Sequence, residues 1–538
     1  MPPALSARTR QQFAWLVLLA LVLGGALWWW LQGRPVALPD ASSARIACVS
    51  YSPFHDPGES PLNTHAFISP TQISADLRRL SKYTNCVRTY SQGQGLSAVP
   101  TIAARYHMHV LMGIWLGSDP KANAQQMALG IATARAHPQV LRGVIVGNEV
   151  LLRGDLSEAQ LAADIRKVRV ALPPSIPVSY ADVWVFWLRH RQLAKAVDFV
   201  TIHTLPYWEN NPVPVGRAVA HVQAVYAGVQ HAFPHKRILI GETGWPSAGR
   251  PRRDAVPSRV NEARYVREFL RYANHANIPY NLIEAFDQPW KRVLEGTAGG
   301  YWGIFNANGH AKFSLHGPVV NIPRWWLGWV AGGIGALVFA LLLGWHQHRW
   351  RHALALILTG AACGMALAWQ ARQMLHACIG AWDWSIAILT CLAALGTALW
   401  LAHALAQRLT TSHGAIRPPR WLNVEWLRLG WLFALALYDL LLIFDGRYRD
   451  FPLSVLALPC AGFALVGWLD TTPRQPAREA LFLAGWLPIL GAIIVAMELG
   501  EDVSTWLWLA ENLAIALPTL GAWLIRRKTS ASAMPRHA

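Results

Sequence analysis

Charged side chains are scarce in this sequence of 538 residues, since Asp, Glu, Lys and Arg together make up only 14% of it. Hydrophobic residues make up 53%, a balance that is unusual for a soluble protein and ordinary for one partly embedded in a membrane. Metal-ligand motifs such as H-E-x-x-H are absent although there are 20 histidines, so we expect no metal and no cofactor. Nothing resembles a nucleic-acid-binding module either, and we expect no nucleic acid as a partner.

Long apolar runs account for the excess of hydrophobic residues. The first run, 13–31, is long enough to cross a bilayer and ends in WWWLQG without an adjoining small-residue cleavage site, which predicts an uncleaved anchor. No such run occurs between Arg34 and Arg324. Seven more follow, at 325–345, 353–369, 385–404, 429–445, 453–469, 481–498 and 506–525. The predicted organisation is a cytoplasmic N-terminus (1–12), the anchor (13–31), a soluble domain (45–320), a seven-helix transmembrane domain (325–525) and a cytoplasmic tail (526–538).

The distribution of Lys and Arg predicts the orientation in the membrane. With the N-terminus in the cytoplasm, the cytoplasmic segments hold 14 basic residues and the opposite short loops hold three. This positive-inside bias predicts a multi-pass protein of the inner (cytoplasmic) membrane, with both termini cytoplasmic and the soluble domain periplasmic or exoplasmic. The 14 are Arg8, Arg10, Arg349, Arg351, Arg408, Arg417, Arg420, Arg428, Arg474, Arg478, Arg526, Arg527, Lys528 and Arg536, and the three are Arg372, Arg447 and Arg449.

Short apolar strands alternate with amphipathic helical patterns throughout the soluble domain. Eight strand–helix units in a domain of this length predict an α/β fold of the (β/α)8 TIM-barrel class, followed by the all-α membrane domain. In such a barrel the residues that follow the C-terminal ends of the strands line one shared mouth. The expected strands are 44–54, 85–91, 109–117, 141–150, 177–184, 197–208, 237–245 and 280–290.

Two glutamates lie at equivalent places in this pattern. Strand four ends in GVIVGNEV, which places Glu149 after a Gly-Asn step, and strand seven ends in ILIGETGW, which contains Glu242. One such carboxylate on its own is more simply explained by an ion pair with a neighbouring Arg. Two carboxylates facing across one mouth are what glycosidic cleavage requires, because one protonates the leaving oxygen while the other attacks the anomeric carbon or activates water.

Together these segments resemble glycoside hydrolase family 17, the β-1,3-glucanase family, in its membrane-anchored bacterial type. The resemblance covers about residues 45–318. It implies that Glu149 is the general acid/base and Glu242 the nucleophile of a retaining reaction, with Glu149 kept protonated until it donates. It also implies that Asn148, Tyr90, Tyr207, Trp245 and Lys291 bind the sugar, the aromatic rings by stacking. The segments are VRTY (87–90), GNE (147–149), HTLPYW (203–208), GETGWPSAG (241–249), AFDQPWK (285–291) and YWGIFNANGHAKF (301–313).

Several alternatives stay open at this stage. The family's hydrolases and transglucosylases share one glycosyl-enzyme, so the sequence predicts a β-glucan as partner, beside the lipid bilayer, without deciding between hydrolysis and transfer. Gln288 stands where plant members usually carry an acid, which leaves the pH optimum open. A glucan-binding or glucan-translocating protein with a non-catalytic barrel is a second hypothesis, and a scaffold that recruits a glucan synthase or export partner is a third.

Three smaller features also allow two readings each. Cys48 and Cys86 lie on neighbouring predicted strands, and the expected compartment permits a disulfide between them if the strand register agrees. Asp439 and Glu511 lie inside apolar runs, where an ionisable group marks a pathway or makes a hydrogen bond between helices.

Overall fold

The computed structural model describes residues 6–343, 350–410, 424–470 and 475–532. The chain forms two compact units. The first comprises Met1–Pro35, Arg250–Arg253 and Val320–Ala538, and the second comprises Val36–Gly249 and Asp254–Val319. Five of the basic residues used to predict the orientation lie outside the described residues, namely Arg349, Arg417, Arg420, Arg474 and Arg536.

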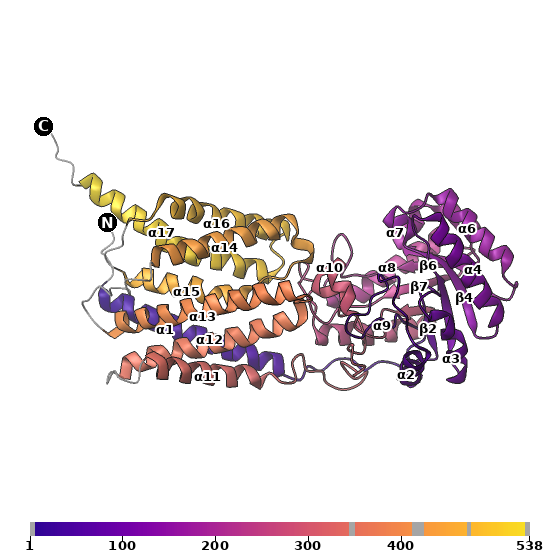
Figure 1. Ribbon diagram of the computed structural model, residues 1–538, viewed down its shortest axis with the longest axis horizontal. Coiled ribbons are helices and arrows are strands. Elements are labelled where there is room, and N and C mark those ends of the chain that lie inside the picture. Colours follow the sequence, from indigo (N-terminus) through magenta and orange to yellow (C-terminus); the bar gives the residue numbers. More distant parts are fainter. Residues whose placement is uncertain (1–5, 344–349, 411–423, 471–474, 533–538) are drawn as a thin grey trace. The chain divides into compact units, whose positions relative to one another are not determined.

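The second unit contains a closed barrel of eight parallel strands in sequence order, which confirms the predicted fold class (Figure 1). Helices follow the strands and surround them, as in other barrels of this class. The strands are β1 (Val49–Ser50), β2 (Cys86–Arg88), β3 (His109–Ile114), β4 (Leu141–Asn148), β5 (Val178–Val183), β6 (Val200–His203), β7 (Ile238–Thr243) and β8 (Tyr280–Leu282).

The strands are almost wholly buried because helices cover the outside of the barrel and side chains fill its interior. Val110, Val144 and Ile240 are typical of them, each with none of its surface exposed. Branched aliphatic residues of this kind favour strands that are buried on both faces. The helices are α2 (Pro70–Leu80), α3 (Val99–Arg105), α4 (Pro120–Ala136), α5 (Val150–Arg153), α6 (Glu158–Ala171), α7 (Trp184–Arg189), α8 (Val215–Ala232), α9 (Arg259–His275) and α10 (Arg292–Gly299).

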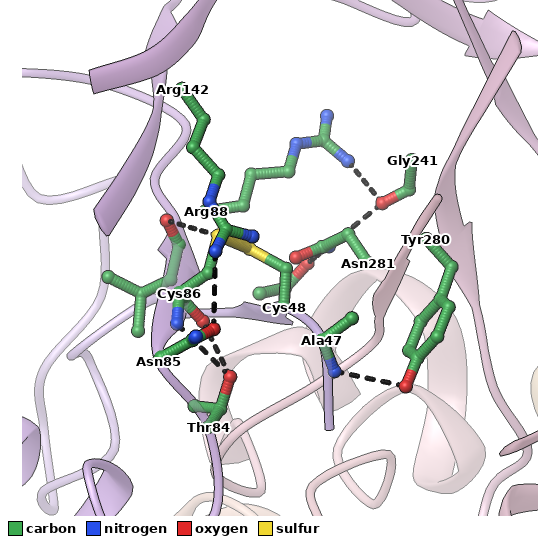
Figure 2. Close-up of a disulfide and its surroundings, with 12 residues drawn as sticks. Ala47, Cys48, Thr84, Asn85, Cys86, Arg88, Arg142, Gly241, Tyr280 and Asn281 are labelled. Atoms are coloured by element: carbon green, nitrogen blue, oxygen red, sulfur yellow. Dashed lines mark hydrogen bonds between the residues drawn. A yellow bond between two sulfur atoms is a disulfide. The ribbon is translucent and has the colours of Figure 1, made fainter. Parts of the chain in front are cut away.

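A disulfide joins Cys48 and Cys86 at the start of the first two strands (Figure 2). The pairing follows from the register of β1 and β2, in which Val49 lies opposite Val87, so that the preceding residues also lie side by side. Both cysteines are buried. The question that the sequence left open is therefore decided by the register of two neighbouring strands.

The described residues of the first unit are largely helical and include eight apolar helices at the positions of the eight predicted runs. Seven are long and apolar enough to cross a membrane, which indicates a multi-pass membrane protein, and α15 is an apolar helix of 17 residues. The helices are α1 (Ala7–Gly33), α11 (Trp326–Leu343), α12 (Trp350–Ala377), α13 (Ala381–Thr410), α14 (Val424–Phe444), α15 (Leu453–Leu469), α16 (Arg478–Met497) and α17 (Val503–Ser532).

Asp439 of α14 makes hydrogen bonds between helices. Its Oδ1 accepts from Trp508 Nε1 at 2.6 Å and from Asn512 Nδ2 at 2.9 Å, both from α17. The interhelical reading is therefore confirmed for Asp439, whose carboxylate is satisfied by donors within the bundle. The Oε2 atom of Glu511 is buried and has no hydrogen-bond partner among the residues that the structure describes.

Candidate active site

The end of β4 turns sharply at the Gly-Asn-Glu step. Gly147 has φ 83°, and a Cβ atom there would lie 2.8 Å from Val150 Cγ2, so the position accepts only glycine without rearrangement. Glu149 has φ 53°, in the left-handed region that residues other than glycine seldom occupy. Such backbone strain is found preferentially at functional sites. Here it accompanies the turn from the strand into α5, and the side chain of Glu149 stays partly exposed.

Glu242 extends from β7 and is 5% exposed. The carbonyl of the preceding Gly241 accepts hydrogen bonds from Arg88 Nη1 and Asn281 Nδ2, each at 2.8 Å, which fixes the backbone beside the carboxylate. A Cβ atom at Gly241 would lie 2.4 Å from the methyl group of Thr201, so the two strands approach closely here. The backbone that carries Glu242 is therefore held from β2, β6 and β8.

His203, at the end of β6, lies between the two glutamates. Its Nδ1 is 2.8 Å from Glu149 Oε1, and its Nε2 is 3.5 Å from Glu242 Oε1. One oxygen of each carboxylate and one ring nitrogen of His203 all lie within 4.8 Å of one another. The barrel thus brings together the two acids that the sequence placed on strands four and seven.

Two residues at and just after the end of β2 bind the Glu242 carboxylate directly. Arg88 Nη1 donates to Glu242 Oε1 at 3.1 Å, and Tyr90 donates its hydroxyl proton to the same oxygen at 2.8 Å. Arg88 also donates through Nη2 to Asn148 Oδ1 at 2.6 Å. Tyr90 and Asn148, both expected to bind sugar, therefore lie in the immediate surroundings of the two carboxylates.

The charges around Glu149 oppose the effect of its burial. Burial disfavours the ionised form, but the hydrogen bond with His203 and the positive charges of His203, Arg153 and Arg88 outweigh it and lower the pKa of Glu149 from its ordinary value. We expected an environment that keeps this acid protonated, but the groups around Glu149 favour its ionised form.

Lys291 approaches the site from the segment after β8. Its Nζ donates to both carboxylate oxygens of Glu284 at 2.9 Å. Although burial works against its charge, the carboxylates of Glu284, Glu295 and Glu242 raise the pKa of Lys291, so it stays positively charged. Burial, together with the charges of Glu149 and Glu242, raises the pKa of Glu295 to about 7 against the opposing effect of Lys291. Lys291 is therefore tied to an acid and lies within electrostatic reach of Glu242.

Tyr207 and Trp245 do not have the position expected of stacking platforms. Tyr207 is 1% exposed and Trp245 is 0% exposed. Tyr207 packs edge-on against Trp245 and Trp302 with ring centroids 6.1 and 6.0 Å apart, and Trp245 Nε1 donates to the carbonyl of Val256. Their motif position indicated the mouth of the barrel, whereas both rings are buried among neighbouring side chains.

Glu149, His203 and Glu242 also form a set of potential metal ligands among the described residues. The guanidinium of Arg88 lies 3.1 Å from Glu242 Oε1 and 3.3 Å from His203 Nε2, so a fixed positive charge already occupies this space. A divalent cation placed among the same groups would be repelled by it. The donor set therefore fits a pair of carboxylates, with Arg88 bound to Glu242, better than a metal site.

Arg88 and His203 were not singled out as candidates from the sequence. Both lie in the segments VRTY and HTLPYW, but an Arg or His at a strand end has many structural explanations. The contact of Arg88 with Glu242 depends on the closure of the barrel, whereas His203 lies opposite Glu242 in the register of the neighbouring strands β6 and β7. The signal that could have identified them is their place at strand ends, with His203 on the strand next to β7 and Arg88 two strands away from β4.

Comparisons with known proteins place residues 48–303 among glycoside hydrolases, since these residues match the family described as the BtgE/BtgC glycoside hydrolase domain. The glucan 1,3-beta-glucosidase of Saccharomyces cerevisiae is 25% identical over 272 residues, covering 46% of this chain and 85% of that protein. The one from Schizosaccharomyces pombe is 27% identical over 256 residues, covering 45% and 79%. This part of the chain is a glycoside hydrolase domain similar to family 17, with distant homology to these fungal proteins.

A solved structure is similar as well. The glycoside hydrolase family 17 beta-1,3-glucanosyltransferase from Rhizomucor miehei is 26% identical, and the match covers 51% of this chain and 98% of that one with a TM-score of 0.45.

Proposed function

We propose that this glycoside hydrolase domain cleaves β-1,3-glucosidic bonds of a β-glucan with retention and passes the cleaved glucosyl unit to water or to another glucan. The observation that carries the proposal is the pair Glu149 and Glu242, which extend from β4 and β7 with carboxylate oxygens within 4.8 Å of each other. This separation suits a retaining enzyme, because an inverting one needs room for a water molecule between its carboxyl groups. The choice of glucan rests on the similarity to the fungal glucan 1,3-beta-glucosidases.

The proposed reaction has two displacements. Glu242, ionised and held by Arg88 and Tyr90, attacks the anomeric carbon while Glu149 protonates the leaving oxygen. Glu149, now a carboxylate, then removes a proton from water or from an acceptor hydroxyl, which attacks the anomeric carbon and releases Glu242. Glu149 takes up its first proton when the bound sugar excludes water from the site, because further desolvation raises the pKa of a carboxylic acid.

The location of the domain is inferred from the distribution of Lys and Arg along the sequence and from the disulfide. We infer that both termini are cytoplasmic and that the domain 45–320 lies outside the cytoplasm, between an anchor at 13–31 and a transmembrane domain at 325–525. Disulfides persist in oxidising compartments and are rare in the cytosol, so the Cys48–Cys86 bond supports this orientation.

The test uses the full-length protein in detergent with a β-1,3-gluco-oligosaccharide whose reducing end has been reduced, and sizes the products by mass spectrometry. Wild type should give shorter products, and longer ones as well if it transfers, whereas Glu149→Gln and Glu242→Gln should lose at least a hundred-fold in rate. Glu158→Gln, a carboxylate on α6 paired with His190, is the matched control and should keep full activity.

Azide distinguishes the two roles. With an aryl β-glucoside as donor, azide should rescue Glu149→Ala and give the β-glycosyl azide, because the glycosyl-enzyme still forms. Azide should rescue Glu242→Gly and give the α-glycosyl azide, because azide then attacks the substrate directly. The same azide anomer from both variants, or wild-type inertness on β-1,3-glucans, contradicts the proposal.

A further inference from the structure

One tryptophan of the barrel unit stands apart from the others. Among the tryptophans of residues 36–319, all of which the structure describes, Trp115 is the most exposed, at 39%. It directly follows β3, so it lies at the end of the barrel where strands β4 and β7 carry the two glutamates. Trp187, Trp245 and Trp302 are buried by comparison.

Arg153 holds this ring in place. Its guanidinium carbon lies 4.4 Å from the centroid of the Trp115 ring, so the guanidinium covers one face of the indole. Arg153 is itself fixed, since Nη2 donates to the carbonyl of Leu116 at 2.8 Å, Nη1 donates to the carbonyl of Asn148, and Nε pairs with Asp155 at 2.7 Å. The ring is therefore ordered in advance, which lowers the entropy that binding would cost.

Arg153 connects the Trp115 ring to Glu149, the proposed acid/base. The backbone N–H of Arg153 donates to the carbonyl of Glu149 at 2.9 Å, one helical turn away, and Arg153 is one of the charges that lower the pKa of Glu149. Because Glu149 protonates the leaving oxygen, the surface beside it faces the leaving part of the glucan in the first step. The acceptor occupies the same place in the second step.

We propose that Trp115 is the stacking platform for a glucosyl residue of the leaving group and of the acceptor, and that it sets the ratio of transfer to hydrolysis. The C–H groups on one side of a β-glucopyranose ring form an apolar face that packs against an aromatic ring. Water needs no such surface, so the platform favours a glucan acceptor over water in the competition for the glycosyl-enzyme. This inference rests on the function proposed above and adds a residue that determines its outcome.

The test separates the two steps of the reaction. Full-length protein in detergent is given an aryl β-1,3-glucobioside as donor and increasing concentrations of a β-1,3-glucotriose as acceptor. Release of the aryl alcohol reports formation of the glycosyl-enzyme, and mass spectrometry reports products longer than the donor sugar. At acceptor concentrations below saturation, Trp115→Ala should lower the ratio of transfer to hydrolysis about three- to ten-fold, the loss expected for one aromatic stacking contact. Aryl alcohol release should fall by a smaller factor than this ratio, because the aryl leaving group needs little assistance.

Two further variants complete the design. Trp115→Phe keeps a flat ring and should recover most of the ratio, which a merely structural role of the indole would not predict. Phe67→Ala removes another exposed aromatic ring, 68% exposed in the segment before α2, and should leave the ratio unchanged.

Four outcomes would overturn the inference. These are an unchanged ratio in Trp115→Ala, an equal loss in Phe67→Ala, a folded Trp115→Ala that loses aryl alcohol release to the same extent, and a wild type that makes no longer product at any acceptor concentration. If Trp115→Ala fails to fold, Trp115→Phe is the deciding variant. A ratio of transfer to hydrolysis in Trp115→Phe that is no higher with acceptor than without it would contradict the role of Trp115 as a platform. Absence of aryl alcohol release from wild type would instead overturn the proposed function itself.

Discussion

Tyr90 donates its hydroxyl proton to Glu242 Oε1 at 2.8 Å, and the same hydroxyl also contacts Ser50 Oγ at 2.9 Å. The oxygen that accepts from Tyr90 also accepts from Arg88 at 3.1 Å. Arg88, the last residue of β2, and Tyr90, two residues further on, therefore orient one carboxylate oxygen of the proposed nucleophile. The second oxygen is left for the anomeric carbon, so the arrangement prepares Glu242 for attack before the sugar arrives.

Tyr90→Phe tests this preparation. The variant removes a hydrogen bond to a charged group, which contributes about 1.5–3 kcal/mol, so kcat/KM on a β-1,3-gluco-oligosaccharide should fall about ten- to a hundred-fold. Tyr106→Phe is the matched control, because its hydroxyl pairs with Ser74 at 2.8 Å away from the two glutamates. Equal losses in the two variants would mean that the phenylalanines act through stability and that the Tyr90 hydrogen bond has no catalytic importance.

His203→Phe should move the alkaline limb of the pH profile of kcat/KM to higher pH. The proposed acid must be protonated to act, and the hydrogen bond and charge of His203 lower the pKa of Glu149. Removal of the imidazole therefore raises this pKa and extends the active form to higher pH, although the maximal rate should fall. Initial rates at low substrate concentration across pH 4 to 9 are the measurement.

Glu295→Gln should shift the pH profile in the direction opposite to His203→Phe. Glu295 has a pKa raised to about 7 by burial and by the charges of Glu149 and Glu242, so above that pH its own charge favours the protonated form of Glu149. The amide removes this charge, and the alkaline limb should move to lower pH. A shift in the same direction for His203→Phe and Glu295→Gln would contradict the electrostatic account of the site.

The stability of the barrel should fall as pH rises, in part because of Glu262. This residue is 1% exposed, and burial raises its pKa to about 8 although Lys312 lies 3.0 Å away. Because the folded state then holds a proton that the unfolded state loses near the ordinary glutamate pKa of about 4.5, stability is greatest below that pH and declines up to about pH 8.

Glu262→Gln should therefore reduce the difference in Tm between pH 5 and pH 8, raising Tm at pH 8 by about 2–4 °C for each kcal/mol recovered. Lys312 keeps a partner in this variant, since its Nζ also lies 2.8 Å from Asp287 Oδ1. Thermal unfolding of the full-length protein in detergent gives the two temperatures, with Glu158→Gln as the control. A pH dependence identical to that of wild type would show that Glu262 does not titrate in this range.

Cys48→Ala should lower the free energy of unfolding of the barrel by about 3–4 kcal/mol, the value expected for a bond that closes a chain segment with a sequence separation of 38. Reductant should lower the Tm of wild type and leave that of Cys48→Ala unchanged. Cys391→Ala, which removes a free cysteine of α13, is the control and should still respond to reductant as wild type does. If reductant has no effect on wild-type protein, the bond is absent from the protein as isolated.

The local pattern of the sequence was sufficient to predict the eight strands and the apolar helices. Alternation of short apolar strands with amphipathic helices depends on the period of each element, and length alone identifies a span of a bilayer. The places of Glu149 and Glu242 also follow from this pattern, because residues after parallel strands meet at one end of a closed barrel.

The contacts between strands were decided only by the tertiary structure. Whether Cys48 meets Cys86 depends on the register of β1 and β2, and whether Arg88 reaches Glu242 depends on barrel closure. The exposure of an aromatic ring depends on every neighbour around it. For this reason Tyr207 and Trp245, chosen by motif, are buried, whereas Trp115, which no pattern singled out, offers its ring to solvent.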